Sequence, residues 1–193
     1  PAMTDKTVSS GAPRFEEPDP AKMDAETRRV YDMVLGKRGK LPGPFRIWLE
    51  NPEFSEIAET FGRRVRFGSG LSRRVVELAT IIACRNAKAQ YAWHSHRNAA
   101  REAGIPEEVI VAIRDGRTPD IEDETEAAVY AFCHEVLENK SVSDETFHRV
   151  DTLIGRAALI DLMGLIGFYG VVAITLNAFN IPPAGGAEPE LPD

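Results

Sequence analysis

The longest apolar stretch of the chain, Ala157 to Ala178, limits the possible folds more than any other feature, because it must be buried in protein or in lipid. It reads AALIDLMGLIGFYGVVAITLNA and is nearly long enough to span a bilayer as a helix. However, Asp161 lies inside it, Asn177 lies near its end, and no second span accompanies it. Three glycines at three-residue steps would let another backbone approach one face closely. They are Gly164, Gly167 and Gly170. We therefore expect a buried core helix and no membrane partner.

The rest of the chain also predicts helices, so we expect an all-α fold. Apolar residues recur with helical spacing, and no run of alternating or β-branched residues indicates a strand. Glycine and proline separate the expected helices. These helices cover residues 25–35, 52–66, 106–116, 123–138 and 144–153, together with one that Ser72 caps and the apolar helix that ends before Pro182.

The size, charge and cysteine content of the chain exclude several classes of protein. A length of 193 residues with 43% hydrophobic residues fits one compact domain, which we place at residues 23–183. We expect residues 1–22, which lack the pattern of a signal peptide, and residues 184–193 to be disordered. The formal charge of −7 argues against nucleic acid as a partner. The two cysteines, Cys84 and Cys133, indicate neither a disulfide framework nor a zinc cluster. We expect a cytoplasmic protein.

The most unusual polar segment is AQYAWHSHRNAA, residues 89–100. On a helix, His94 and His96 point in directions roughly 200° apart and cannot share an ion, so we expect no metal site. His96 could instead work as an acid or base with Glu77, a carboxylate among apolar residues. In one straight helix these two residues would lie roughly 28 Å apart. Their pairing therefore requires a turn within residues 85–88, which the composition alone leaves open.

A family resemblance covers this segment. The stretch LSRRVVELATIIACRNAKAQYAWHSHRNAAREAGIPEEVI resembles the core motif of the carboxymuconolactone decarboxylase family, which includes the alkylhydroperoxidase D proteins. GPFRIWLENPEFSEIAETFGRRVRFGSGLSRR before it and LIDLMGLIGFYGVVAITLNAFNIPP after it resemble the longer members, so the likeness runs from Met23 to Pro183. It implies an alkylhydroperoxidase D-like helical bundle, a helical break before the histidine-bearing segment, and assembly into a homotrimer or homohexamer with sites near the subunit contacts.

The peroxidase branch of that family carries a glutamate followed by C-x-x-C-x-x-x-H. On this chain the glutamate falls on Glu77 and the histidine on His96, whereas the cysteine positions fall on Ala89 and Ala92. The thiol peroxidase and disulfide reductase chemistry of that branch should therefore be absent. The relay histidine that some of those enzymes carry between the cysteines corresponds to Tyr91.

The resemblance to the decarboxylase-like members, whose aromatic residue before the histidine matches Trp93, favours a lyase that decarboxylates a small anionic lactone or aromatic catabolite. The reaction leaves a dienolate, which hydrogen-bond donors stabilise and a general acid reprotonates, so no metal or cofactor is required. We expect His96 as the acid, Glu77 as the group that orients it, and Tyr91 as a second donor. A peroxidase that uses Cys84 alone and a non-catalytic oligomeric binding protein are the alternatives.

Further side chains are candidates for substrate binding: Trp93, Arg46, Trp48, Tyr169 and His94. Arg46 either holds a substrate carboxylate through two hydrogen bonds or is solvated. Trp93 either forms a wall of the pocket or packs in the core. The Tyr169 hydroxyl faces either a pocket or a backbone carbonyl. Five arginines within residues 63–74 either attract anionic substrates or, as we favour, pair with acidic residues such as Glu126 across a subunit contact.

Overall fold

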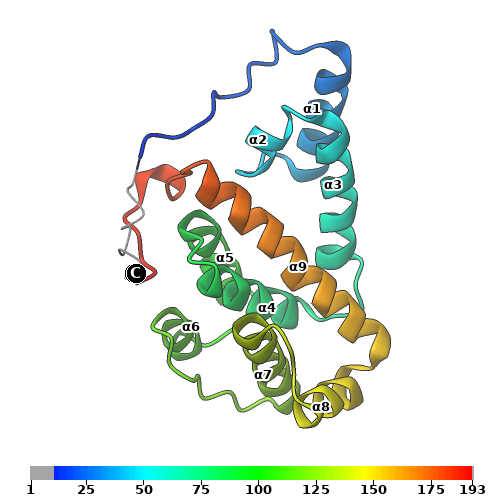
Figure 1. Ribbon diagram of the computed structural model, residues 1–193, viewed down its shortest axis with the longest axis vertical. Coiled ribbons are helices and arrows are strands. Elements are labelled where there is room, and N and C mark those ends of the chain that lie inside the picture. Colours follow the sequence, from blue (N-terminus) through cyan, green and yellow to red (C-terminus); the bar gives the residue numbers. More distant parts are fainter. Residues whose placement is uncertain (1–10, 193) are drawn as a thin grey trace, which may run out of the picture.

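The computed structural model describes residues 11–192, and all of the regular secondary structure in this part of the chain is helical (Figure 1). The all-α prediction is confirmed. The helices are α1 (Ala25–Arg38), α2 (Phe45–Trp48), α3 (Pro52–Phe67), α4 (Arg73–Asn86), α5 (Gln90–Glu102), α6 (Glu107–Arg114), α7 (Glu124–Asn139), α8 (Asp144–Ile154), α9 (Arg156–Ala178) and the short 3-10 turn η1 (Ala184–Gly186). The Ser72 hydroxyl accepts a hydrogen bond from the Val75 N–H at 3.2 Å, so the predicted cap of α4 is present.

The long apolar run forms α9, which crosses the molecule diagonally with α3 on one side and α4 and α5 on the other (Figure 1). Among the described helices, α9 has the length and apolar composition of a membrane span. One of its faces packs into the core through Leu159, Leu162, Leu165, Ile166, Phe168, Tyr169, Val172, Ala173 and Leu176. Each fully buried leucine contributes about 1.5–3 kcal/mol relative to an exposed one. This face explains why α9 is stable inside the bundle.

Glycines allow close packing between α3 and α9, but only some of the glycines expected to do so lie at this contact. A Cβ atom at Gly164 would lie 3.1 Å from Cγ1 of Val65, and one at Gly62 would lie 2.5 Å from Cζ of Phe168. In contrast, a Cβ at Gly167 or Gly170 would meet nothing within 4 Å. Of the three α9 glycines, only Gly164 is therefore required for close packing within one chain.

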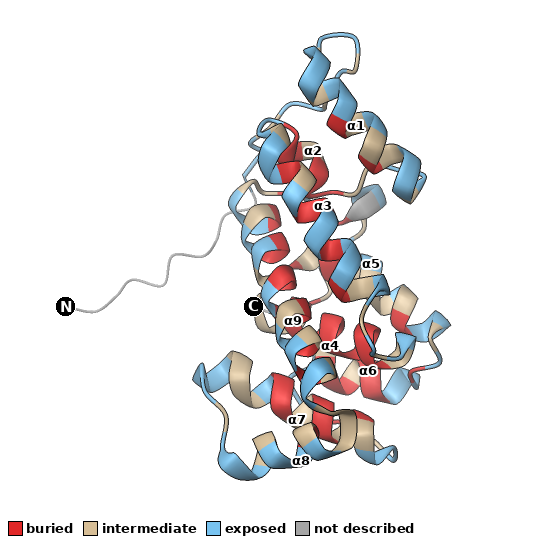
Figure 2. Ribbon diagram, turned by 90° about the vertical axis from the view of Figure 1, so that its right-hand side faces the viewer, coloured by how far each residue is buried: buried red, intermediate tan, exposed pale blue. Residues whose placement is uncertain are grey.

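The central helix of the bundle is α4, which packs against α5, α7 and α9. Figure 2 shows buried residues along α4 and on the facing sides of its neighbours. The helix ends at Asn86, and Lys88 then takes the left-handed conformation at φ 49°. The Ala89 N–H donates to the carbonyl of Cys84 at 2.9 Å, which closes the turn before α5 begins at Gln90. The predicted break is therefore present, and α4 and α5 form a hairpin.

The C-terminal segment after η1 differs from its expected disorder, because it lies against α5. The side-chain amide of Gln90 accepts hydrogen bonds from the N–H groups of Glu190 and Leu191 and donates to the Leu191 carbonyl at 2.8 Å. Leu191 is buried in the core cluster. At the other end, residues 1–10 of the expected lead-in lie outside the described part, and the N–H of Arg14 donates to the carbonyl of Phe179. Burial of Leu191 and the hydrogen bonds of the Gln90 amide thus hold in place a segment whose composition predicts disorder.

Candidate functional site

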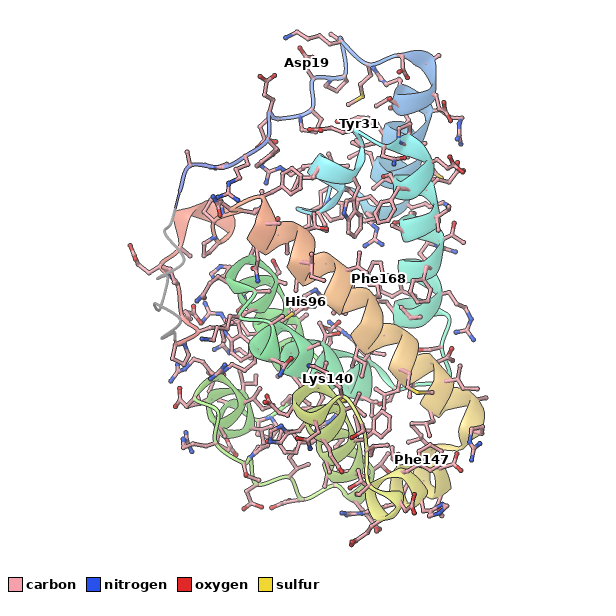
Figure 3. All side chains as sticks on the ribbon, in the orientation of Figure 1. Asp19, Tyr31, His96, Lys140, Phe147 and Phe168 are labelled. Atoms are coloured by element: carbon pink, nitrogen blue, oxygen red, sulfur yellow. The ribbon has the colours of Figure 1, made fainter. Side chains whose placement is uncertain are left out.

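His96, labelled in Figure 3, belongs to a polar network of side chains from four helices. Its Nδ1 lies 2.9 Å from Oε2 of Glu77 on α4, and its Nε2 lies 3.0 Å from the hydroxyl of Tyr169 on α9. The His96 and Tyr169 rings meet edge to face, with centroids 4.9 Å apart. The α4–α5 hairpin thus brings Glu77 and His96 together as required, and α9 adds Tyr169.

The fourth member of the network is Arg66, near the C-terminal end of α3. Its Nη2 lies 3.3 Å from Oε1 of Glu77, and the two side chains are 16% and 6% exposed. The guanidinium also stacks over the ring of Phe67, 4.7 Å from its centroid. This arginine places a permanent positive charge beside a buried carboxylate. The sequence offers only one signal for it, its membership of the arginine-rich segment.

These contacts set the protonation states of the network. Burial alone would raise the pKa of Glu77, but the hydrogen bond from His96 and the charge of Arg66 outweigh it and lower that pKa. Burial and the charge of Arg66 lower the pKa of His96 below its usual value, although Glu77 opposes this shift. At neutral pH the pair is therefore a carboxylate and a neutral imidazole. The Nδ1–H of His96 donates to Glu77, and its Nε2 accepts from Tyr169.

The Tyr169 hydroxyl keeps its proton, because burial raises the pKa of this phenol well above its usual value. One buried polar atom of the network, Nε of Arg66, has no hydrogen-bond partner among the described residues. Buried donors and acceptors without partners are rare in native structures.

Cys84 lies close to this network, and its thiol is buried. It lies on α4 two turns after Glu77 and is 1% exposed. Burial, and secondarily the charge of Glu77, raises the pKa of this thiol far above its usual value. A thiolate is the nucleophilic form of cysteine, and burial here favours the protonated thiol. Ala89 and Ala92, at the positions where redox relatives carry cysteines, are also buried.

Tyr91 does not lie beside His96. Five residues separate them on α5, which turns their side chains roughly 140° apart. Tyr91 instead lines a cavity that it shares with Arg46. The phenol that contacts His96 is that of Tyr169.

Trp48 and Trp93 are both core residues. The Trp48 indole N–H donates to Oγ1 of Thr175 at 2.9 Å, and its ring packs edge to face on Phe168. The Trp93 side chain is 1% exposed, and its indole N–H donates to Oε2 of Glu190 at 3.3 Å. Neither ring lines the cavity that contains Arg46. The structure thus favours the packing interpretation of Trp93.

His94 and His96 point to different surroundings, as their spacing predicts. His94 Nδ1 lies 3.7 Å from Oε1 of Glu190, in a cluster that Arg97 completes. Within residues 11–192, no group of three or more histidine, cysteine, aspartate or glutamate side chains is placed to hold a metal ion. His94 therefore helps to hold the C-terminal segment on α5.

The arginine-rich segment 63–74 pairs with acidic residues of its own chain. Arg74 Nε lies 2.6 Å from Oε1 of Glu126 on α7, a residue that we expected across a subunit contact. Arg64 lies 3.1 Å from Asp161 on α9. These pairs connect α3 and α4 to the rest of the bundle, so they do not require a second copy of the chain.

The comparison with known families agrees with the resemblance. Residues 52–135 match the model of the Carboxymuconolactone decarboxylase family. This match begins with α3 and ends within α7. It therefore includes Arg66, Glu77 and His96. The predicted family resemblance is confirmed. No curated protein matches the chain in sequence.

Several solved structures share the fold at low sequence identity. The alkylhydroperoxidase AhpD core of an uncharacterized peroxidase-related protein from Ralstonia eutropha JMP134 is 17% identical, with a TM-score of 0.74 over 92% of this chain and 97% of that one. A protein of unknown function from Agrobacterium tumefaciens is 16% identical, with a TM-score of 0.64 over 74% and 98%. The debrominase Bmp8, bound to 2,3,4-tribromopyrrole, is 16% identical, with a TM-score of 0.68 over 84% and 87%. These similarities show the AhpD-like fold.

Proposed function

Because residues 52–135 are those of the carboxymuconolactone decarboxylase family, we propose that the protein is a cofactor-free carboxy-lyase that acts on a small carboxylated lactone or aromatic catabolite by acid–base chemistry. The observation that carries this proposal is the continuous network from Arg66 through Glu77 and His96 to Tyr169. A carboxylate that orients an imidazole, which in turn contacts a hydroxyl, is an arrangement for moving protons. It contains no thiol.

The proposed reaction breaks the bond between the substrate ring and its carboxylate. Carbon dioxide leaves, the electron pair stays in the ring as a dienolate, and a proton is then added to carbon. The Tyr169 hydroxyl stabilises the developing oxyanion by hydrogen bonding. His96, protonated on Nε2, supplies the proton to carbon and regains it from water. Glu77 stabilises the imidazolium while it carries the charge.

Substrate binding provides the protonated imidazole in this scheme. In the free protein the lowered pKa of His96 keeps the ring neutral at pH 7. A bound carboxylate near the ring adds negative charge, which favours the imidazolium and raises the pKa in the complex. Binding of the substrate therefore favours protonation of His96, the group that donates the proton.

The buried state of Cys84 supports this proposal over a peroxidase that uses that thiol. Peroxide reduction requires a thiolate, and burial holds the pKa of Cys84 far above its usual value. The two mechanisms depend on different residues, which makes them separable by substitution. Cys84→Ser should leave the proposed lyase active, whereas His96→Ala should inactivate it.

The test is carbon dioxide release from a panel of carboxylated lactones and β-keto acids. We expect release by the unmodified protein, and at least about 100-fold slower release by His96→Ala and Glu77→Gln, because general acid–base catalysis contributes 10²–10⁴-fold. Cys84→Ser is the matched control on the same helix. No release from any panel member by the folded protein would refute the proposal, as would equal losses in Cys84→Ser and His96→Ala.

We further infer that the chain forms a homo-oligomer, a homotrimer or homohexamer, through an apolar face on α3 and α9. These two helices pack together and expose eight large apolar side chains, of which Phe67 lies at the end of α3 beneath the Arg66 guanidinium and the other seven form the face. These seven are Phe54, Ile57, Phe61, Ile160, Met163, Val171 and Ile174. Monomeric soluble proteins rarely expose rows of such residues. The absence of a Cβ at Gly167 and Gly170, where the structure leaves open space, would let a neighbouring backbone approach this face.

A further inference from the structure

The cavity that Tyr91 and Arg46 line lies at the N-terminal end of α5 and is separate from the His96 network. Its volume is about 420 Å³, a size that suits a small organic molecule. It is lined by Pro13, Phe15, Glu17, Arg46, Tyr91, Pro182, Pro183 and Gly185. His96, Glu77 and Tyr169 are not among these residues, so a function for this cavity goes beyond the proposed lyase site.

Among the described residues that line the cavity, Arg46 carries the only permanent positive charge. Its Nε donates to Oε2 of Glu17 at 2.9 Å, and its Nη2 forms an ion pair with the other carboxylate oxygen. The guanidinium also stacks over the ring of Phe15, 4.9 Å from the centroid. The arginine thus holds a carboxylate in the two-pronged geometry that guanidinium groups favour.

The two partners differ in their exposure to solvent. The Arg46 side chain is 24% exposed, whereas that of Glu17 is 66% exposed. An ion pair with a mostly exposed partner is weak, because water and salt screen it. Glu17 is therefore a carboxylate that another carboxylate can replace at little cost.

The opposite wall of the cavity is apolar and fixed. A Cβ atom at Gly43 would lie 2.5 Å from Cε1 of Tyr91, so the loop backbone packs directly on the tyrosine ring. Pro182 and Pro183, which follow α9, have restricted backbones and complete this side. One cation and a rigid apolar wall are the usual features of a site for a small apolar anion.

We propose that this cavity binds a small aromatic or lactone carboxylate, which displaces Glu17 from Arg46. The ligand carboxylate takes over the two hydrogen bonds that Glu17 now accepts. The ligand ring packs against Phe15, Tyr91 and the two prolines. Glu17 is an internal competitor that lowers the apparent affinity and favours ligands with a ring over simple acids.

Competition between Glu17 and the ligand for Arg46 predicts measurable changes in ligand affinity. A competing contact reduces apparent affinity by the fraction of molecules in which the site is free. For an exposed ion pair this factor is small, so Glu17→Gln should bind the ligand about two- to fivefold more tightly. Arg46→Leu should bind it at least about tenfold more weakly, because a charge-assisted pair of hydrogen bonds is lost.

The experiment is an NMR titration of the ¹⁵N-labelled protein with benzoate, and with benzamide as its uncharged counterpart. We expect benzoate to shift signals of Tyr91 and Arg46, and benzamide to bind at least about tenfold more weakly. Glu56→Gln is the matched control, because Glu56 forms a similar two-pronged pair with Arg29 on the surface. The affinity of the Glu56→Gln variant for benzoate should equal that of the unmodified protein.

The outcomes separate this proposal from the lyase. Equal benzoate affinity in Glu17→Gln and Glu56→Gln, or benzoate binding that survives Arg46→Leu in a protein with an unchanged melting temperature, would overturn it. If Arg46→Leu does not fold, the Glu17→Gln result alone decides. His96→Ala should retain benzoate binding at this cavity, so a failure of carbon dioxide release leaves the result of the titration unaffected.

Discussion

Replacing Arg66 with methionine tests the electrostatic basis of the His96 network. The substitution keeps much of the side-chain volume but removes the charge 3.3 Å from Oε1 of Glu77. Two unit charges at this distance attract each other by about 5 kcal/mol at an effective dielectric constant of 20, before the cost of desolvation. Removing one partner of a buried pair typically destabilises a protein by about 3–5 kcal/mol. Because His96 still donates a hydrogen bond to Glu77, we expect Arg66→Met to lower the free energy of unfolding by about 2–3 kcal/mol.

The assay is urea unfolding at pH 7, with Arg64→Met as the matched control. Arg64 lies on the same helix and pairs with Asp161 at 3.1 Å, but its side chain is 55% exposed. Exposed pairs contribute about 0–1 kcal/mol, so the control should lose no more than that. A double-mutant cycle with Glu77→Gln isolates the coupling between Arg66 and Glu77.

A second measurement follows the protonation of His96 directly. The charge of Arg66 contributes to the lowered pKa of His96, so Arg66→Met should raise that pKa toward its usual value. An NMR titration of the imidazole signals measures it. If Arg66→Met and Arg64→Met have equal unfolding free energies, or if the His96 pKa does not rise, Arg66 is not the charge that organises the network.

Three further predictions concern the network and the apolar face. Tyr169→Phe should slow carbon dioxide release by at least about tenfold through loss of an oxyanion donor, whereas Tyr91→Phe should change it less than threefold; the comparison of initial rates decides. The free energy of unfolding should fall as the pH drops below the unfolded-state pKa values of 6.5 for His96 and 4.5 for Glu77. Both pKa values are lowered in the folded state, so protons bind the unfolded chain first. Urea unfolding from pH 8 to pH 4 should show this loss, and His96→Gln should remove the part of it that occurs at the higher pH values. Ile174→Glu should lower the mass measured by light scattering to that of one chain, since it places a charge in the exposed apolar face.

The sequence was sufficient to pair Glu77 with His96 and to name Tyr169 as a candidate, but not to place Arg66 and Tyr169 beside them. The turn after Asn86 follows from the family motif, and it folds α5 back on α4 so that residues far apart in one straight helix come together. Arg66 and Tyr169 come from α3 and α9, whose packing on α4 depends on the complete bundle. No local spacing relates either residue to His96. Their contacts therefore had to come from the structure.

Tyr91 shows the opposite case, in which local geometry was available from the sequence. The motif aligns Tyr91 with a relay residue, which favours a place beside His96. Helical periodicity, however, turns residues five apart by roughly 140°, and the structure agrees with the periodicity. Arg46 could not be placed by either route, because its partner Glu17 lies in a segment that the composition predicts to be disordered.

The two alanines at the cysteine positions determine what kind of chemistry this network can support. Ala89 and Ala92 are 0% and 3% exposed and bring no polar group next to the histidine-bearing face of α5. Charge that forms on His96 must therefore be balanced by Glu77, which Arg66 holds in the ionised state. Such a site is suited to a proton that moves and returns within one turnover. Alanine at both cysteine positions thus fits the acid–base chemistry that we propose for these side chains.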